Sequence, residues 1–292
     1  MSRPETQAFR KVDLILPSRE TIEGAGVHLR RAFGNREVPK LDPFLLLDDF
    51  RSDNPAEYVA GFPWHPHRGI ETVTYVLQGE VHHKDTLGNS GSIGAGDVQW
   101  MTAGRGIMHE EMPQVRPEGI AGFQLWVNLP ATLKMTRPRY QDIRSDTIPE
   151  IKKADGARIR VITGRVDKVS GPVTDIAADP TYLDVFVPAR ASFIHPIERG
   201  HTAFAYVFEG EARFGSRDRA DDPPISSPTL VVLGDGDAVQ VTTGETPVRF
   251  LLVSGKPLHE PIARYGPFVM NTQEEIRQTL LELSQGTFVT TA

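Results

Sequence analysis

The apolar residues of this chain fall into short runs that alternate with turn residues. The 26 Gly and 23 Pro residues are scattered through the sequence and cut these runs to the length of single strands. The runs are rich in β-branched and aromatic residues, which is typical of short antiparallel strands. Examples are ETVTYVLQG, DVQWMT, GFQLWVNL, LDVFVP, AFAYVFEG and VRFLLVSG. The pattern therefore predicts an all-β fold, a sandwich or a barrel.

Helical periodicity is clear only near the C-terminus, in NTQEEIRQTLLELSQG. Asn271 or Thr272 can cap this helix, acidic residues in its first turn suit the helix dipole, and Gly286 can end it. We expect one short C-terminal helix that packs on the β-structure.

An internal repeat indicates that one barrel has been duplicated. TYVLQGEV at 74–81 matches AYVFEGEA at 205–212, and GAGDVQW at 94–100 matches GDGDAVQV at 234–241. Each copy then ends in a further apolar strand. A duplication accounts for both the chain length and the number of strands.

The boundary between the two barrels is expected between about residues 130 and 180, a region with polar and Pro-containing stretches. We therefore expect an N-terminal barrel of residues 1–140 and a C-terminal barrel of residues 141–292 that ends in the helix. Counting back from the matched tyrosines, Glu198 stands where His67 stands in the first copy. The second barrel is therefore expected to be free of metal.

Composition excludes several classes of function. Hydrophobic residues make up 39% and charged residues 24%, as in a folded globular protein. A net charge of -6 offers no basic field for nucleic acid. The chain has no Cys, so any metal must use nitrogen and oxygen ligands. No apolar stretch approaches the roughly 20 residues of a membrane span, and we expect a cytoplasmic protein without a membrane partner.

Two His-containing pairs carry the candidate chemistry. His65 and His67 are two residues apart at the start of a strand, so both side chains point to the same face. Pro66 between them favours the extended conformation. His109 and Glu111 have the same spacing on a second strand. Three imidazoles and one carboxylate suit one divalent transition metal, with Fe(II) as our first choice and Mn, Co, Ni, Cu or Zn as alternatives.

Large apolar side chains flank these pairs in the sequence. Phe62, Trp64, Trp100 and Met101 are candidates to line a pocket for a small aromatic substrate, although such residues more often form barrel core. We expect the remaining histidines to be solvent-facing, structural or surface groups: His28, His82, His83, His195, His201 and His259.

At these residues the chain resembles the pirin family of bicupins over nearly its whole length. The similarity is carried by GFPWHPHRGIETVTYVLQGE, GDVQWMTAGRGIMHEEMP, FQLWVNLP, LDPFLLLDDF and YGPFVMNTQEEI. The resemblance implies a tandem cupin fold, two jelly-roll barrels, with a single metal in the first. It also implies that His65, His67, His109 and Glu111 are the ligands.

The oxygen ligand has a rival. In many cupins a carboxylate follows the His-x-His motif by three or four residues, and Glu71 stands at such a position. The pirin-like interpretation favours Glu111 and leaves Glu71 as a nearby polar group that could orient a histidine.

The resemblance further suggests a quercetin 2,3-dioxygenase that acts on flavonols with dioxygen. Glu111 is then either a ligand alone or also the general base. The competing hypothesis is a non-catalytic regulator, whose metal senses redox state and alters a surface that binds transcription factors or metabolic enzymes. A third alternative is a metal that only stabilises the barrel.

Overall fold

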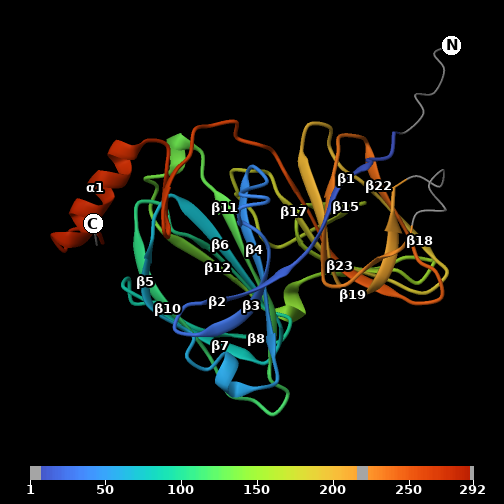
Figure 1. The fold of residues 1–292 in the computed structure, drawn as a ribbon, viewed down its shortest axis with the longest axis horizontal. Coiled ribbons are helices and arrows are strands. Elements are labelled where there is room, and N and C mark those ends of the chain that lie inside the picture. The colour runs from blue at the N-terminus through green and yellow to red at the C-terminus, as the bar shows by residue number, and fades with distance from the viewer. Residues whose placement is uncertain (1–7, 216–222, 290–292) are drawn as a thin grey trace. The chain divides into compact units, whose positions relative to one another are not determined.

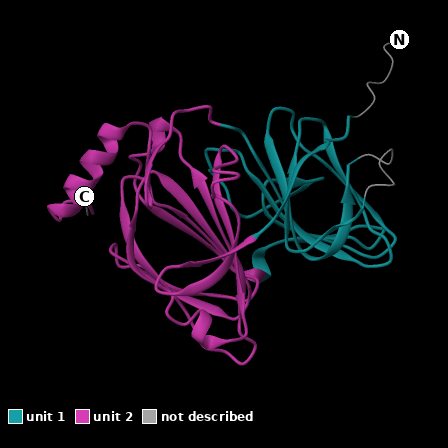
Figure 2. Ribbon diagram, in the orientation of Figure 1, with its two compact units in different colours: residues 1–18, 146–257 teal, residues 19–145, 258–292 magenta. Residues whose placement is uncertain are grey.

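The computed structural model describes residues 8–215 and 223–289, which form two compact units (Figures 1 and 2). Unit 1 combines the N-terminal segment that ends at Ser18 with residues 146–257. Unit 2 combines residues 19–145 with the C-terminal segment that begins at Leu258. A single cut at 140/141 therefore assigns both terminal segments to the opposite unit. The physical reason is that the N-terminal segment pairs with a strand of unit 1, and the C-terminal segment packs within unit 2.

Unit 2 is built from two main antiparallel sheets, a two-stranded hairpin and a terminal helix. Its strands are β2 (Arg19–Glu23), β3 (Val27–Phe33), β4 (Phe44–Ser52), β5 (Phe62–His67), β6 (Ile70–Gln78), β7 (Glu80–Asp85), β8 (Ser90–Gly94), β9 (Val98–Thr102), β10 (Ile107–Pro113), β11 (Ile120–Asn128), β12 (Arg139–Ile143), β24 (Ala263–Tyr265) and β25 (Phe268–Met270). The larger sheet has the order β12-β9-β6-β11-β4-β3-β2 and the smaller β5-β10-β7-β8. Buried side chains of β3, β4, β6 and β11 pack against Val81 and Ile93 of the smaller sheet, so the two sheets enclose a core.

The C-terminal segment returns to unit 2 as a β24–β25 hairpin followed by helix α1 (Gln273–Ser284). Thr272 caps α1 in a capping box with Glu275, which confirms the predicted helix and selects Thr272 as its cap. Helix α1 packs through Ile276 on a small cluster that includes Phe268 and Phe288.

Unit 1 contains the second barrel. Its strands are β1 (Val12–Pro17), β13 (Glu150–Lys152), β14 (Arg158–Thr163), β15 (Arg165–Val166), β16 (Val169–Ser170), β17 (Thr181–Val187), β18 (Ser192–Pro196), β19 (Thr202–Phe214), β20 (Ile225–Ser226), β21 (Thr229–Leu233), β22 (Ala238–Thr242) and β23 (Val248–Gly255). The main path is β1-β21-β19-β23-β17-β14-β13, and β22 joins β18 to the second half of β19. The N-terminal strand β1 is part of this unit because it pairs with β21.

Short 3-10 helices complete the described elements: η1 (Pro55–Glu57), η2 (Ala131–Leu133) and η3 (Ser145–Thr147). No helix among the described residues is long and apolar enough to cross a membrane. The predicted all-β fold with one short C-terminal helix is therefore confirmed.

The two copies of the repeat correspond in one part and differ in another. Strand β6 lies between β9 and β11, as the first half of β19 lies between β21 and β23, so the tyrosine motifs are equivalent. The Gly-Asp motifs are not. The first precedes β9, whereas the second precedes β22, which pairs with β18 and β19 as β10 pairs with β5 and β7. Gly-Asp turns are common at strand connections. Matching the two Gly-Asp motifs in the sequence therefore paired two turns that are not equivalent in the structure.

A histidine-lined wall in the barrel of unit 2

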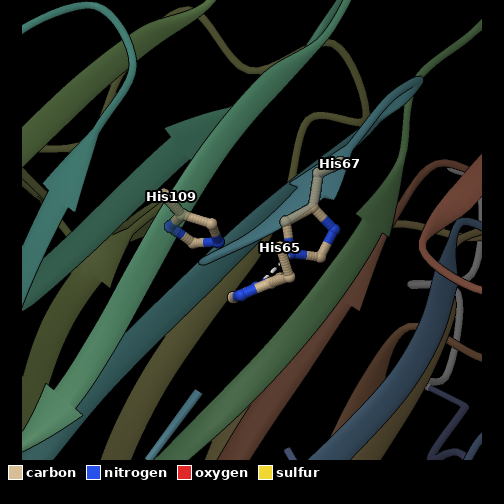
Figure 3. A group of neighbouring side chains, drawn as sticks. All are labelled: His65, His67 and His109. Atoms are coloured by element: carbon tan, nitrogen blue, oxygen red, sulfur yellow. Dashed lines mark hydrogen bonds between the residues drawn. The ribbon is translucent and has the colours of Figure 1, made fainter. Parts of the chain in front are cut away.

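Neighbouring strands β5 and β10 bring the three candidate histidines together. His65 lies opposite His109, and His67 lies opposite Ile107 in this antiparallel pair. The three imidazoles converge from the two strands (Figure 3). One ring nitrogen from each histidine lies within 4.8 Å of a ring nitrogen of each of the other two.

The separations fit a shared ion. Nε2 of His65 lies 3.0 Å from Nε2 of His67, and the rings of His65 and His109 have centroids 4.4 Å apart. Two nitrogen ligands at about 2.1 Å from one ion and at right angles to each other are separated by about 3.0 Å. The spacing of the first two histidines is thus that of adjacent ligands.

The protonation state of His67 and His109 also suits ligation. His109 is buried, and neither of its ring nitrogens has a hydrogen-bond partner among the described residues. Burial, reinforced by the charge of the neighbouring histidines, lowers the pKa of both His67 and His109 well below the ordinary value. Neutral imidazoles present the lone pairs that a metal requires. Nδ1 of His65 lies 2.8 Å from the Pro63 carbonyl and can donate to it, which leaves Nε2 for a ligand role.

Glu111, the fourth predicted ligand, lies on the same strand as His109 but outside this group. It is buried opposite Phe62, and its Oε1 accepts a hydrogen bond of 2.9 Å from the Thr74 hydroxyl. The Thr74 oxygen also lies 2.7 Å from the side-chain amide of Gln124. The structure thus brings three of the four residues into one cluster and holds the carboxylate beside it.

Glu71, the rival carboxylate, belongs to the larger sheet. It is buried on β6, where the Thr102 hydroxyl donates to its Oε1 at 2.7 Å. Burial raises the pKa of Glu71 above its ordinary value. Its side chain does not line the cavity beside the histidines, whereas that of Glu111 does.

That cavity has a volume of about 660 Å³ and lies entirely within unit 2. His65, His67 and Glu111 form part of its wall, and Phe62 and Trp64 also line it. Its apolar wall comes from residues of the enclosed core: Val27, Leu29, Phe50, Tyr58, Val81 and Ile120. The volume is in the range of small-molecule sites.

Trp100 and Met101, the other two predicted pocket residues, lie elsewhere. Both are buried in β9 and neither lines the cavity. Met101 packs in a separate core cluster with Ile70 and Ile107. The larger sheet buries every residue of β9, so closeness in sequence to the ligands did not bring these side chains to the cavity.

Phe62 reaches the cavity through a backbone irregularity. The register of β5 against β10 shifts between the pairs His109–His65 and Glu111–Phe62, the mark of a β-bulge. Phe62 and His65 are three positions apart, so strict alternation would place them on opposite faces. The bulge restores Phe62 to the interior.

Comparisons with known proteins decide the family. A family model described as Pirin matches residues 26–127, and one described as Pirin C-terminal cupin domain matches residues 182–289. The chain is 43% identical over 280 residues to a pirin-like protein from Caulobacter vibrioides, covering 96% of this chain and 99% of that protein. The chain belongs to the pirin family.

Two further likenesses agree with this assignment. The chain is 44% identical over 277 residues to human pirin, covering 94% of this chain and 92% of that protein. It also resembles a crystal structure of quercetin 2,3-dioxygenase from Acinetobacter baumannii, with a TM-score of 0.86 and 35% identity, covering 98% of this chain and all of that one. The family expected from the sequence motifs is therefore confirmed.

One histidine of this pirin-family chain differs from the sequence-based expectation. His83 was expected to face solvent, but only 4% of it is exposed, and its ring stacks on Tyr140 at 5.8 Å. It lies opposite Glu111 in the pairing of β7 with β10. His82, its neighbour, is exposed as expected. Alternate residues of a strand share one face, so Val81, His83 and Asp85 lie together on the buried face of β7. This alternation is the sequence signal that could have separated His83 from His82.

In the second barrel of this pirin-family chain, the equivalent strand pair carries apolar side chains and one buried histidine, His195. In the equivalent strand pair, Phe193 lies opposite Val241, and all three of Phe193, Val239 and Val241 belong to the buried core. His195 is buried and stacks on Phe193. Elsewhere in unit 1, the ligand atoms of Asp179, Glu198 and His201 lie within 4.8 Å of one another, with both carboxylates on exposed residues.

Proposed function

We propose that this protein is a metal-dependent dioxygenase that acts on flavonols such as quercetin. The observation that carries the proposal is the set of three close imidazoles, two of which, His65 and His67, line a largely apolar cavity. The likeness to a protein described as quercetin 2,3-dioxygenase supports the choice of substrate class. We propose His65, His67 and His109 as ligands, with Glu111 as the fourth.

The donor set favours one divalent transition metal. Nitrogen and carboxylate donors without sulfur suit Fe(II), our first choice, and also Mn, Co, Ni, Cu or Zn. When bound, such a metal supplies Lewis-acid chemistry that lowers the pKa of a substrate hydroxyl and offers sites for dioxygen.

The chain's own residues would bind the substrate and manage its proton. Phe62 and the apolar wall of the cavity offer a surface for an aromatic ring and exclude water from it. Glu111, beside the histidines, is the proposed acceptor of the substrate hydroxyl proton. Thr74 holds Oε1 of this carboxylate and so orients it toward the cavity.

The test is turnover of quercetin by protein loaded separately with Fe, Mn, Co, Ni or Cu, followed as loss of quercetin absorbance under air. We expect turnover with at least one metal and its loss in His109→Ala. His82→Ala is the matched control, because His82 is exposed and outside the cavity. Glu111→Gln should bind quercetin but turn it over about 100-fold more slowly than the wild type, because it lacks the general base.

Absence of turnover with every metal would contradict the dioxygenase proposal and leave a non-catalytic, metal-sensing regulator as the better hypothesis. Wild-type turnover in His109→Ala would separate the reaction from the proposed site.

A further inference from the structure

The C-terminal hairpin contributes a cation to the cavity. Arg264 of β24 lines it together with Gly266 and Pro267 of the β24–β25 turn. Its guanidinium lies over the ring of Trp126, 5.2 Å from the ring centroid. Trp126 in turn contacts His67 edge to face, with centroids 5.0 Å apart. The cation is thus connected to the proposed metal site through one aromatic ring.

Nearby carboxylates are already engaged by another arginine. Arg31 makes two hydrogen bonds of 2.8 Å to the carboxylate of Asp48, and its remaining amino group contacts Glu23 at 2.8 Å. This fork geometry satisfies Asp48 on both oxygens. Among the described residues, both carboxylates form their ion pairs with Arg31 and neither forms one with Arg264.

Arg264 itself has no anionic partner among residues 8–215 and 223–289. No described carboxylate lies within 4.0 Å of its guanidinium. Its Nε donates to the Gly266 carbonyl at 3.3 Å, a long hydrogen bond. Partial burial lowers the pKa of Arg264, and the charge of Arg31 acts in the same direction, while Glu23 and Asp48 oppose it. The guanidinium nonetheless stays charged at neutral pH.

We propose that Arg264, held over the ring of Trp126, is an anion-binding subsite that selects aromatic substrates carrying an anionic oxygen. A guanidinium held over an indole ring by a cation–π contact still has amino groups that can donate to an oxygen anion. The apolar wall around Phe62 accepts the ring of the same molecule. The subsite rests on the proposed function and deepens it, because it names the charge of the substrate that this cavity prefers.

The proposal is tested with a matched pair of ligands that differ only in charge. Isothermal titration calorimetry of chelator-treated, metal-free protein at neutral pH measures the affinities for 2-naphthoate and its neutral amide, 2-naphthamide. One charge-assisted contact predicts about tenfold tighter binding of the anion to the wild type. Arg264→Met keeps the length of the side chain but should bring the ratio to about one.

Two further variants make the result specific. Arg277→Met removes an exposed arginine of α1 that does not line the cavity, so it should keep the wild-type ratio. Arg264→Lys keeps the charge and should keep part of the preference. Equal selectivity in the wild type and Arg264→Met, or no preference for the anion in the wild type, would overturn the proposal.

The binding assay is independent of turnover. If naphthoate selectivity depends on Arg264 but no metal supports quercetin oxidation, the subsite stands and the dioxygenase proposal fails. If quercetin is oxidised, Arg264→Met should raise KM by about tenfold with little change in kcat, because the residue contacts substrate away from the reacting atoms.

Discussion

Replacing Lys134 with Met tests how the loop behind the histidines is held. Lys134 is 1% exposed, and its ammonium donates to the carbonyls of Gly69 and Val269 and to Oδ1 of Asn128, at 2.8 to 2.9 Å. Gly69 follows His67 by two residues, and Val269 belongs to β25. The side chain therefore joins the His65–His67 segment to the C-terminal hairpin.

Two opposing effects set the size of the change. Methionine leaves three buried oxygens without their donor, at about 1 kcal/mol each. It also removes a buried charge. Burial lowers the pKa of Lys134 from 10.5 to about 8, against the opposing charges of Glu260 and Glu275. That shift corresponds to about 3 kcal/mol, so the two effects nearly offset each other at pH 7.

The balance changes with pH in a defined direction. Below pH 8 the lysine is protonated in both the folded and the unfolded chain, and the cost of its burial is fully present. Between pH 8 and 10.5 the unfolded chain still holds the proton that the folded chain has released, so the free energy of unfolding rises with pH. The wild type should gain about 2 kcal/mol over Lys134→Met between pH 7 and about pH 9.5.

Urea unfolding of metal-free protein, followed by tryptophan fluorescence, measures this difference. All three tryptophans, Trp64, Trp100 and Trp126, lie in unit 2, so the signal reports the unit that contains Lys134. Lys84→Met is the control, because Lys84 is exposed in the same unit. An equal destabilisation by Lys134→Met at both pH values, or a loss of wild-type stability relative to the variant at the higher pH, would refute the reasoning.

Three other substitutions have expected effects on stability, each measured by thermal or urea unfolding of unit 2. Arg68→Met should cost about 2 kcal/mol, because it leaves the half-buried Glu282 carboxylate of a 2.7 Å ion pair and the Arg105 carbonyl without their donor; a cost below about 0.5 kcal/mol would show that the pair does not anchor α1. Thr272→Ala should cost about 1 kcal/mol through loss of the capping box, and Thr272→Ser should restore most of it. Gly69→Ala should cost more than about 2 kcal/mol, because the φ of 78° is strained for alanine and its Cβ would overlap the carbonyl of Val269; an unchanged midpoint would contradict this.

Local pattern was sufficient for the strands, the helix and the convergence of the histidines. Alternation along a strand depends only on the backbone, so the spacing of His65 and His67 was enough to predict that they share a face. The same holds for the capping of α1, which is decided by residues within one turn.

Features that depend on distant parts of the chain could not be predicted in this way. Arg264 enters the cavity because the C-terminal segment returns to unit 2, and nothing in the sequence around it signals that return. The position of Phe62 in the cavity wall depends on a β-bulge. The burial of Trp100 away from the cavity depends on the place of β9 in the larger sheet.

The central claim is that a transition metal binds between β5 and β10. Crystals of protein reconstituted with Fe(II), measured on both sides of the iron absorption edge, give an anomalous difference map that locates the ion directly. We predict one strong peak in unit 2 at about 2.1 Å from ring nitrogens of His65, His67 and His109, with Glu111 rather than Glu71 as the nearest carboxylate. A peak elsewhere, or none beside these histidines in iron-loaded crystals, would contradict the account.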